Sequence, residues 1–302
     1  MIINPTARSG KAVKLWNKVE RLLKRQNIQY EHAFTKKTDD AIDLAKSVSV
    51  KGYDVVVACG GDGTICDVIT GILSADTRIK PALGVIHIGT SPDFNRHCGI
   101  PVDIDKAVDT LVSCNVKKID IGQVKYFDLQ NNERISYFGS SVNIGIGPYI
   151  ANGANSRNRK YLGDFLGTLV STIASLFKFK GSILKGEIDG RSIHFGNILN
   201  LTIGKDPYLA SGMRVFNDIK PDDGRLYVLS IKKSSTINLL LNLHKLYIGD
   251  FLKYKEATIN YCSDIKVESE CDRTFIEFDG DMRGMVPAEV SVKNKALKVV
   301  AK

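Results

Sequence analysis

Three glycines, an aspartate and a threonine make residues 60–64 (GGDGT) the segment with the clearest chemical potential. They follow an apolar run over 54–58, typical of a buried strand, and precede a helical pattern over 65–73. Glycines let the backbone approach a ligand closely, and free N–H groups at the start of a helix favour an anion. The segment therefore predicts a phosphate-binding loop, although neither GxxxxGK[ST] nor GxGxxG is present. The alternative is a structural turn capped by Asp62 and Thr64.

Asp62 lies in the middle of this loop, where its carboxylate would repel a bare phosphate. Mg²⁺ or a substrate proton between the two groups would remove that repulsion. Asp62 is therefore a candidate catalytic base or a candidate organiser of a magnesium ion.

Two other loops resemble the first in position. Residues 89–94 follow an apolar run over 83–88 and offer the hydroxyl of Thr90, while residues 4–11 follow Ile2 and Ile3 and offer hydroxyls, two cations and a helix start. Ligands of open α/β sheets bind beyond the carboxyl ends of the strands. Three loops at one edge could hold the phosphates of a nucleotide.

The first 120 residues alternate strand and helix patterns, which predicts an α/β domain with a parallel sheet and helices on both faces. Thr38 is the expected N-cap of the second helix. The predicted strands are 2–3, 30–34, 54–58 and 83–88, and the predicted helices are 11–26, 39–48, 65–73 and 105–114.

Residues 121–302 read mostly as strands with polar turns, which predicts an antiparallel β-sandwich whose C-terminal end is a candidate for packing back on the first domain. A hairpin is expected over 119–130 and 134–146. Later strands are expected over 194–203, 226–232, 257–268, 273–278 and 289–300, interrupted by helices over 160–177 and 236–252.

The net charge of +9 and the pI near 9.1 favour an anionic partner. Dispersed positive charge and the lack of a recognised motif argue against nucleic acid. Residues 157–185 are rich in lysine and arginine around an apolar helix, which is too short to cross a membrane but could lie on an anionic surface; an ordinary amphipathic helix is the alternative. Six scattered cysteines predict reduced, mostly buried thiols in a cytosolic protein.

The sequence resembles the soluble lipid kinases that share the diacylglycerol kinase catalytic domain, including bacterial diacylglycerol kinases and, more distantly, sphingosine kinases. The resemblance runs nearly end to end. GGDGT also occurs in NAD kinases, but the later segments favour lipid kinases. The segments that carry the resemblance are NPTARSGK (4–11), GGDGT (60–64), LGVIHIGTSPDF (83–94), SGMRVFNDIKPDDGRL (211–226) and FIEFDGD (275–281).

This resemblance implies an N-terminal nucleotide domain, a C-terminal β-sandwich with a lipid pocket, and catalysis in the cleft between them. It implies a structural Mg²⁺ bound by the Asp223 carboxylate with the carbonyls of Lys220 and Arg225; a plain turn is the alternative. The implied ATP contacts are Asn4, Pro5, Thr6, Ser9, Gly10, Thr35, Gly61, Asp62, Gly63, Thr64, Asp67 and Thr90.

Asp281 is the carboxylate that the resemblance assigns as general base, at a position where the family usually has glutamate. A surface turn is the alternative for residues 279–281. Pro92 replaces an asparagine that the family commonly has, and so removes an amide and a backbone donor. Apolar residues such as Val142, Ile144 and Ile146 could line a lipid pocket or belong to the core.

The leading hypothesis is an ATP- and Mg²⁺-dependent kinase that phosphorylates diacylglycerol. It would be a cytoplasmic protein that works transiently at the inner membrane surface. The alternatives are an NAD kinase and a nucleotide-binding, membrane-associated regulator without turnover. Edge strands of the second domain could also pair in a homodimer.

Overall fold

The computed structural model describes residues 1–302 except 11, 154–169, 210–212, 216–217, 249–253 and 271–272. Several predicted features lie outside the described residues: Lys11, the part of the expected 160–177 helix before residue 170, the end of the 236–252 helix, and Cys271. The other five cysteines are free thiols, of which Cys114 is the exposed one.

The first domain contains a sheet with the strand order β4-β3-β1-β2. These strands are β1 (Ile2–Ile3), β2 (Ala33–Phe34), β3 (Val55–Gly60) and β4 (Ala82–His87). The pairs β1–β2, β1–β3 and β3–β4 are each parallel. The carboxyl ends of all four strands therefore lie along one edge of the sheet.

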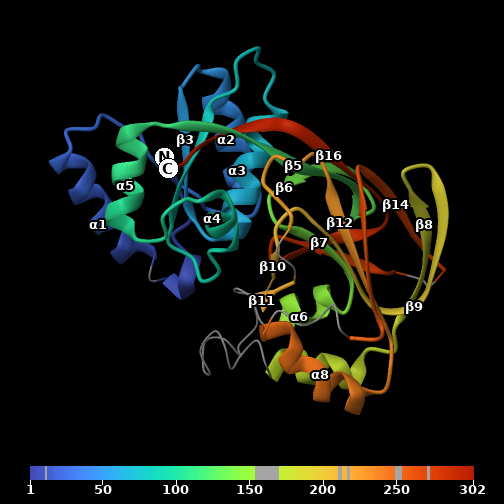
Figure 1. Ribbon diagram of the computed structural model, residues 1–302. Helices are drawn as coiled ribbons and strands as arrows, with labels where there is room; N and C mark the ends of the chain where they lie inside the picture. The colour runs from blue at the N-terminus through green and yellow to red at the C-terminus, as the bar shows by residue number, and fades with distance from the viewer. Residues whose placement is uncertain (11, 154–169, 210–212, 216–217, 249–253, 271–272) are drawn as a thin grey trace.

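Helices cover both faces of this sheet (Figure 1). Side chains alternate along each strand, so that Ile2 and Ala58 pack under α2 (Asp40–Val50) and α3 (Asp62–Ser74). Their neighbours Ile3 and Cys59 pack against α1 and α5 on the other face. The remaining helices are η1 (Ala7–Gly10), α1 (Ala12–Arg25), α4 (Asp93–Cys98) and α5 (Ile104–Ser113).

Two local features of this domain differ from the sequence prediction. Asp39, not Thr38, is the N-cap of α2, and its side chain accepts no cap hydrogen bond. The carboxylate of Asp40 instead accepts hydrogen bonds from the backbone N–H groups of Lys36 and Lys37, at 2.7 and 3.2 Å. The short helix α4 follows Pro92 directly, and its six residues are too few for periodicity to reveal.

The second domain is mostly antiparallel. The hairpin of β5 (Val116–Asp128) and β6 (Glu133–Phe138) forms as predicted. The prediction was wrong for residues 141–145, which leave the hairpin as β7 (Ser141–Gly145) and pair with β9 and β15. The other strands are β8 (Ser182–Ile188), β9 (Arg191–Gly204), β10 (Tyr208–Leu209), β11 (Met213–Arg214), β12 (Leu226–Lys232), β13 (Ala257–Cys262), β14 (Asp264–Ser269), β15 (Phe275–Phe278) and β16 (Asp281–Val300).

The long strand β16 joins the two domains. It pairs antiparallel with β15, β14 and β5, and near its end Val299 pairs parallel with Leu83 of β4. The sheet of the first domain is thus hydrogen-bonded to the strands of the second. This continuity fixes the β15–β16 turn relative to the loops of the first domain.

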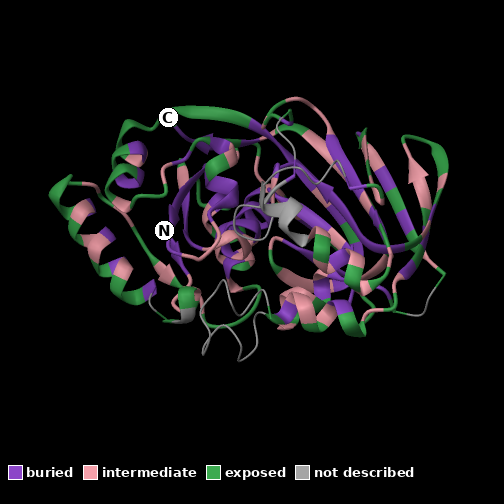
Figure 2. Cartoon of the chain, turned by 60° about the horizontal axis from the view of Figure 1, so that its bottom comes forward, coloured by how far each residue is buried: buried purple, intermediate pink, exposed green. Residues whose placement is uncertain are grey.

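Two apolar clusters lie on opposite sides of β9 and β12. One is the interior between the strands of the second domain, where Val142 and Ile144 are fully buried; this assigns them to the core. The other includes Leu199, Leu229 and Ile231 and lies under α8 (Thr236–Ile248) and a helical segment over 170–178, close to α6 (Gly147–Gly153). Figure 2 shows the buried residues gathered along the strands of both domains.

Candidate active site

The loops after β1, β3 and β4 touch one another at the carboxyl edge of the first sheet. A Cβ atom on Gly89 would lie 2.3 Å from the Cα atom of Gly61, so these two backbones approach as closely as glycine permits. The side-chain amide of Asn4 donates a hydrogen bond of 3.0 Å to Oγ1 of Thr64. The three predicted phosphate loops therefore form one surface.

Asp62 occupies the first turn of α3 and does not cap it, because the helix has no side-chain cap hydrogen bond. Its Oδ1 atom is buried without a hydrogen-bond partner. Burial, followed by the charges of Asp93, Asp279 and Asp206, raises the pKa of Asp62 well above its usual value. A buried carboxylate oxygen without a partner is costly, so this atom is suited to a cation or a proton donor from a ligand.

The β15–β16 turn brings two more carboxylates to the same place. A Cβ atom on Gly63 would lie 2.6 Å from Oδ2 of Asp281, so the predicted base directly faces the glycine loop. Asp279 takes a left-handed conformation with φ 49°, and its carboxylate accepts three backbone hydrogen bonds of 3.2 Å from residues 139–141. The turn is therefore anchored, unlike a free surface turn.

Arg283 connects Asp281 to the first domain. Its guanidinium lies 3.3 Å from Oδ2 of Asp281 and 2.9 Å from Oδ1 of Asp67 on α3. Burial opposes, and Arg283 favours, the charged form of Asp67, whose pKa is raised to about 6. Asp281 and Arg283 both lie on β16, and Arg283 thus restricts the position of the Asp281 side chain.

A hydrogen-bonded network follows next to these acids. Glu277 accepts hydrogen bonds from the backbone N–H of Gly280 at 2.6 Å and from the side chain of Asn143 at 2.9 Å. The amide oxygen of Asn143 in turn accepts hydrogen bonds from Asn200 and Thr202. Burial raises the pKa of Glu277 to about 7.

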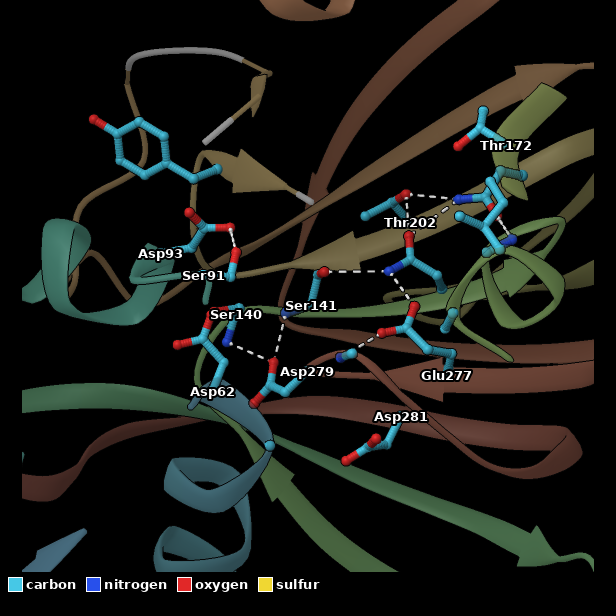
Figure 3. A pocket seen from close by; sticks show the side chains of 18 of the residues that line it. Asp62, Ser91, Asp93, Ser140, Ser141, Thr172, Thr202, Glu277, Asp279 and Asp281 are labelled. Atoms are coloured by element: carbon cyan, nitrogen blue, oxygen red, sulfur yellow. Dashed lines mark hydrogen bonds between the residues drawn. The ribbon is translucent and has the colours of Figure 1, made fainter. Parts of the chain in front are cut away.

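One cavity of about 440 Å³ is lined by the glycine loops, by the carboxylates of Asp62, Asp279 and Asp281, and by the network of Glu277 and Asn143 (Figure 3). Asp62, Asp93 and Asp279 lie at one end of the view, and Thr202 and Thr172 lie at the other. Beyond the network of Asn143 and Glu277 the wall becomes apolar. The apolar lining residues are Ile146, Ile150, Ala151, Leu176, Leu199, Leu229, Ile231, Leu239 and Tyr254.

Seven of the predicted nucleotide-contact and catalytic residues line this cavity: Asn4, Gly61, Asp62, Gly63, Thr64, Thr90 and Asp281. The others lie beside it. Oγ1 of Thr6 donates to Asn4, and the backbone of Thr35 follows β2 next to β1. Pro5 and Gly10 belong to the same loop as Thr6, Asp67 contacts Arg283, and the side chain of Ser9 lies outside the description.

Sequence reasoning did not identify Glu277, Ser140, Asp206 or Arg283. Ser140 lines the cavity, and its hydroxyl donates a hydrogen bond of 3.2 Å to Asp206. Glu277 and Arg283 lie two residues before and two residues after the DGD turn (279–281), and this closeness in sequence is the signal that could have identified them as site residues. Asp206 and Ser140 lie 66 positions apart, so only the fold brings them together.

The residues predicted to hold a structural metal lie outside this cavity, in the turn before β12. The carboxylate of Asp223 accepts hydrogen bonds from the side chains of Lys205 and Arg225 and from the backbone N–H of Lys220. Within the described part of the chain, no helix is long and apolar enough to cross a membrane.

Comparisons with known proteins agree with this two-domain arrangement. Residues 1–124 match the diacylglycerol kinase catalytic domain, and residues 140–301 match the YegS C-terminal NAD kinase beta sandwich-like domain. A diacylglycerol kinase of Staphylococcus aureus (strain JH9) is 29% identical over 293 residues, which cover 95% of this chain and 87% of that protein.

Solved structures show the same fold. A diacylglycerol kinase from Bacillus anthracis superposes with a TM-score of 0.69 at 19% identity, covering 100% of this chain and 95% of that one. Yeast NADH kinase is more distant, with a TM-score of 0.53 at 13% identity and coverage of 100% and 82%. With these two domains in this order, the chain belongs to the family of the YegS C-terminal domain, carries a diacylglycerol kinase catalytic domain ahead of it, and is a phosphotransferase with an alcohol group as acceptor.

Proposed function

We propose that this protein transfers the γ-phosphate of ATP to the hydroxyl of a membrane lipid, with diacylglycerol as the substrate and phosphatidic acid as the product. The observation that carries the proposal is the single cavity, which has glycine loops and carboxylates at one end and apolar side chains at the other. A lipid has both a polar headgroup and apolar chains, so its hydroxyl could meet the phosphate loops while its chains fill the apolar end.

The residues at the polar end suit ATP and Mg²⁺. The glycines let the loops and the β15–β16 turn pack closely, since a Cβ atom at Gly89 would meet Gly61 and one at Gly63 would meet Asp281. The start of α3 then offers free backbone N–H groups to a phosphate. The buried, unpartnered oxygen of Asp62 suits a divalent cation. Among the described residues, no group of three or more histidine, cysteine or acidic side chains is arranged to hold a metal, so Asp62 would share the ion with the phosphates. A magnesium ion there would neutralise phosphate charge.

Asp281 is the proposed general base. The lipid hydroxyl oxygen forms a bond to the γ-phosphorus as the bond to the bridging oxygen of ADP breaks, and Asp281 accepts the hydroxyl proton. Its carboxylate lies beside Gly63 and is restrained by Arg283. Asp is one methylene shorter than glutamate, and the proposal requires the close approach of the β15–β16 turn to the glycine loop to make up the difference in reach.

An exposed apolar surface near the cavity supports transient binding to an anionic membrane. Ile237 and Leu241 on α8 are 72% and 69% exposed, and Phe177 is 69% exposed. The start of α8 lies beside this phenylalanine, because Thr236 hydrogen-bonds the carbonyl of Leu176. Exposed lysines at 178 and 180 could contact anionic headgroups. This surface would hold the protein at the cytoplasmic face while a lipid enters the cavity.

The experiment is transfer of radiolabelled phosphate from ATP to diacylglycerol in mixed micelles. Asp62→Ala and Asp281→Ala should abolish transfer without unfolding the protein. Asp54→Ala is the matched control, because Asp54 is exposed at the opposite end of β3. Full activity in either cavity variant would refute the role given to that residue.

Other acceptors separate the remaining candidates. Phosphatidylglycerol, ceramide, sphingosine and undecaprenol test the choice of lipid, and transfer to NAD alone would replace the proposal with an NAD kinase. ATP binding by calorimetry without transfer to any acceptor would favour a regulator without turnover. Binding to vesicles tests the surface: Ile237→Ser with Leu241→Ser should weaken it, whereas Ile79→Ser, an equally exposed isoleucine of the first domain, should not.

A further inference from the structure

The side chain of Lys205 lies at the centre of the turn where the family resemblance implies a structural metal. Lys205 directly follows β9, and its side chain is 1% exposed. Its ammonium group contacts Oδ1 of Asp223, the carbonyl oxygen of Arg225 at 3.2 Å, and Oδ2 of Asp120 at 2.9 Å. An ammonium group has three donors, and here each has one oxygen partner.

Two of these three oxygen ligands belong to residues expected to bind Mg²⁺, namely the Asp223 carboxylate and the Arg225 carbonyl. We infer that the ammonium group of Lys205 takes the place of that magnesium ion, so that this chain folds without a metal at Asp223. The inference concerns the fold and holds whichever acceptor the enzyme uses.

The charges around Lys205 already balance. The carboxylates of Asp120 and Asp223 face the side chains of Lys205 and Arg225, whose Nε atom donates to Asp223 at 3.1 Å. Arg225 also contacts Asp218 at 3.7 Å, at the exposed edge of the site, so a dication added beside the buried carboxylates would leave an excess of positive charge. Mg²⁺ also requires near-octahedral oxygen ligands at about 2.1 Å, whereas the ammonium group occupies the space between the oxygens.

The other hydrogen bonds at this site keep its oxygens in place without a metal. Asp120 accepts the backbone N–H groups of Gly224 at 2.7 Å and Lys295 at 2.8 Å. The backbone N–H of Lys205 donates to the carbonyl of Ser140, a residue of the cavity wall, at 2.8 Å. The lysine therefore joins β5, β9, β16 and the turn before β12, and it supports one wall of the active site.

The test measures thermal unfolding of the full-length, nucleotide-free protein in excess EDTA and in millimolar magnesium chloride. We expect that magnesium bound at Asp223 makes no contribution to the melting temperature of the wild-type protein. Lys205→Ala should unfold at a temperature several degrees lower in EDTA and should be partly restored by magnesium chloride, because the freed oxygens could then bind a cation. Lys205→Met should be destabilised without restoration, because its side chain fills the space. Lys266→Ala, an exposed lysine, is the control.

Metal analysis of the wild-type protein keeps the inference testable if the Lys205 variants fail to fold. After gel filtration without nucleotide, we expect no magnesium that depends on Asp223. One equivalent of magnesium that is retained in Asp62→Asn but lost in Asp223→Asn would overturn the inference. Magnesium lost in Asp62→Asn instead would belong to the active site and would agree with it.

Discussion

Glu277 should make the stability of this protein fall as the pH rises. Burial raises its pKa from the ordinary value of 4.5 to about 7, although hydrogen bonds from Gly280 and Asn143 favour the charged form. The folded state therefore holds a proton that the unfolded state has lost between these two values. Its contribution to stability is complete below about pH 4.5 and is lost as the pH rises through 7.

The size of this effect follows from the shift. A rise from 4.5 to about 7 corresponds to about 3 kcal/mol, of which about 2–3 kcal/mol falls between pH 5 and pH 8. Glu277→Gln removes the titration but also faces an amide group towards the amide of Asn143. That cost does not depend on pH. The change with pH in the difference between the wild-type and variant free energies of unfolding therefore reports the ionisation of Glu277 alone.

The assay is urea unfolding at pH 5 and pH 8, followed both by circular dichroism and by the fluorescence of Trp16, the single tryptophan. Coincident transitions would justify one free energy for the whole chain. Relative to the wild type, Glu277→Gln should gain about 2–3 kcal/mol between pH 5 and pH 8. Glu133→Gln, an exposed glutamate of β6, should gain none. A difference for Glu277→Gln that is equal at both pH values would refute the reasoning.

Three further variants test the site. Gly63→Ala should lose kcat with little change in melting temperature, because its methyl group would push the half-exposed carboxylate of Asp281 away from the position that Arg283 gives it; unchanged kcat would contradict this contact. Arg283→Met should lower the free energy of unfolding in urea by about 3–5 kcal/mol at pH 8, because it leaves the buried carboxylate of Asp67 without its partner. The loss should be smaller at pH 5, where Asp67, with a pKa of about 6, takes up a proton. An equal loss at both pH values would contradict the ion pair. Ile231→Phe should lower kcat/KM for long-chain diacylglycerol about tenfold more than for short-chain diacylglycerol, because the larger side chain fills part of the apolar end of the cavity. Equal losses would show that the apolar end does not bind the lipid chains.

The sequence predicts the positions of the three glycine-containing loops well because its signals are local. A glycine run between an apolar strand and a helix predicts both the loop and its place at the sheet edge, and Gly60 to Thr64 lie there as expected. Thr90 and Asn4 reach the same edge because β1, β3 and β4 are adjacent. Parallel pairing places loops that are about 30 or more residues apart in sequence at one edge.

The sequence does not predict side-chain contacts between residues on strands that are far apart along the chain. Lys205 contacts Asp120, which lies 85 positions earlier, and an isolated lysine in a polar turn gives no sign that it will be buried. The family resemblance named Asp223 as a metal ligand, but no local signal indicated that Lys205 would contact it. Residues 141–145 illustrate a second limit, because alternation predicts a strand but not which strand it pairs with.

The surroundings of Lys205 and of Asp62 are built in opposite ways. Around Lys205 the chain supplies its own positive charge, so the site is balanced as it stands and serves the fold. Around Asp62 the acids Asp279 and Glu277 are buried close by, all with raised pKa values, and one oxygen of Asp62 has no partner. Hydrogen bonds offset part of the cost of burying Asp279 and Glu277, but the unpartnered oxygen of Asp62 is destabilising in the free enzyme, and a cation bound there would relieve that cost. We therefore expect a cation bound beside Asp62 to stabilise the folded protein, whereas the surroundings of Lys205 need none.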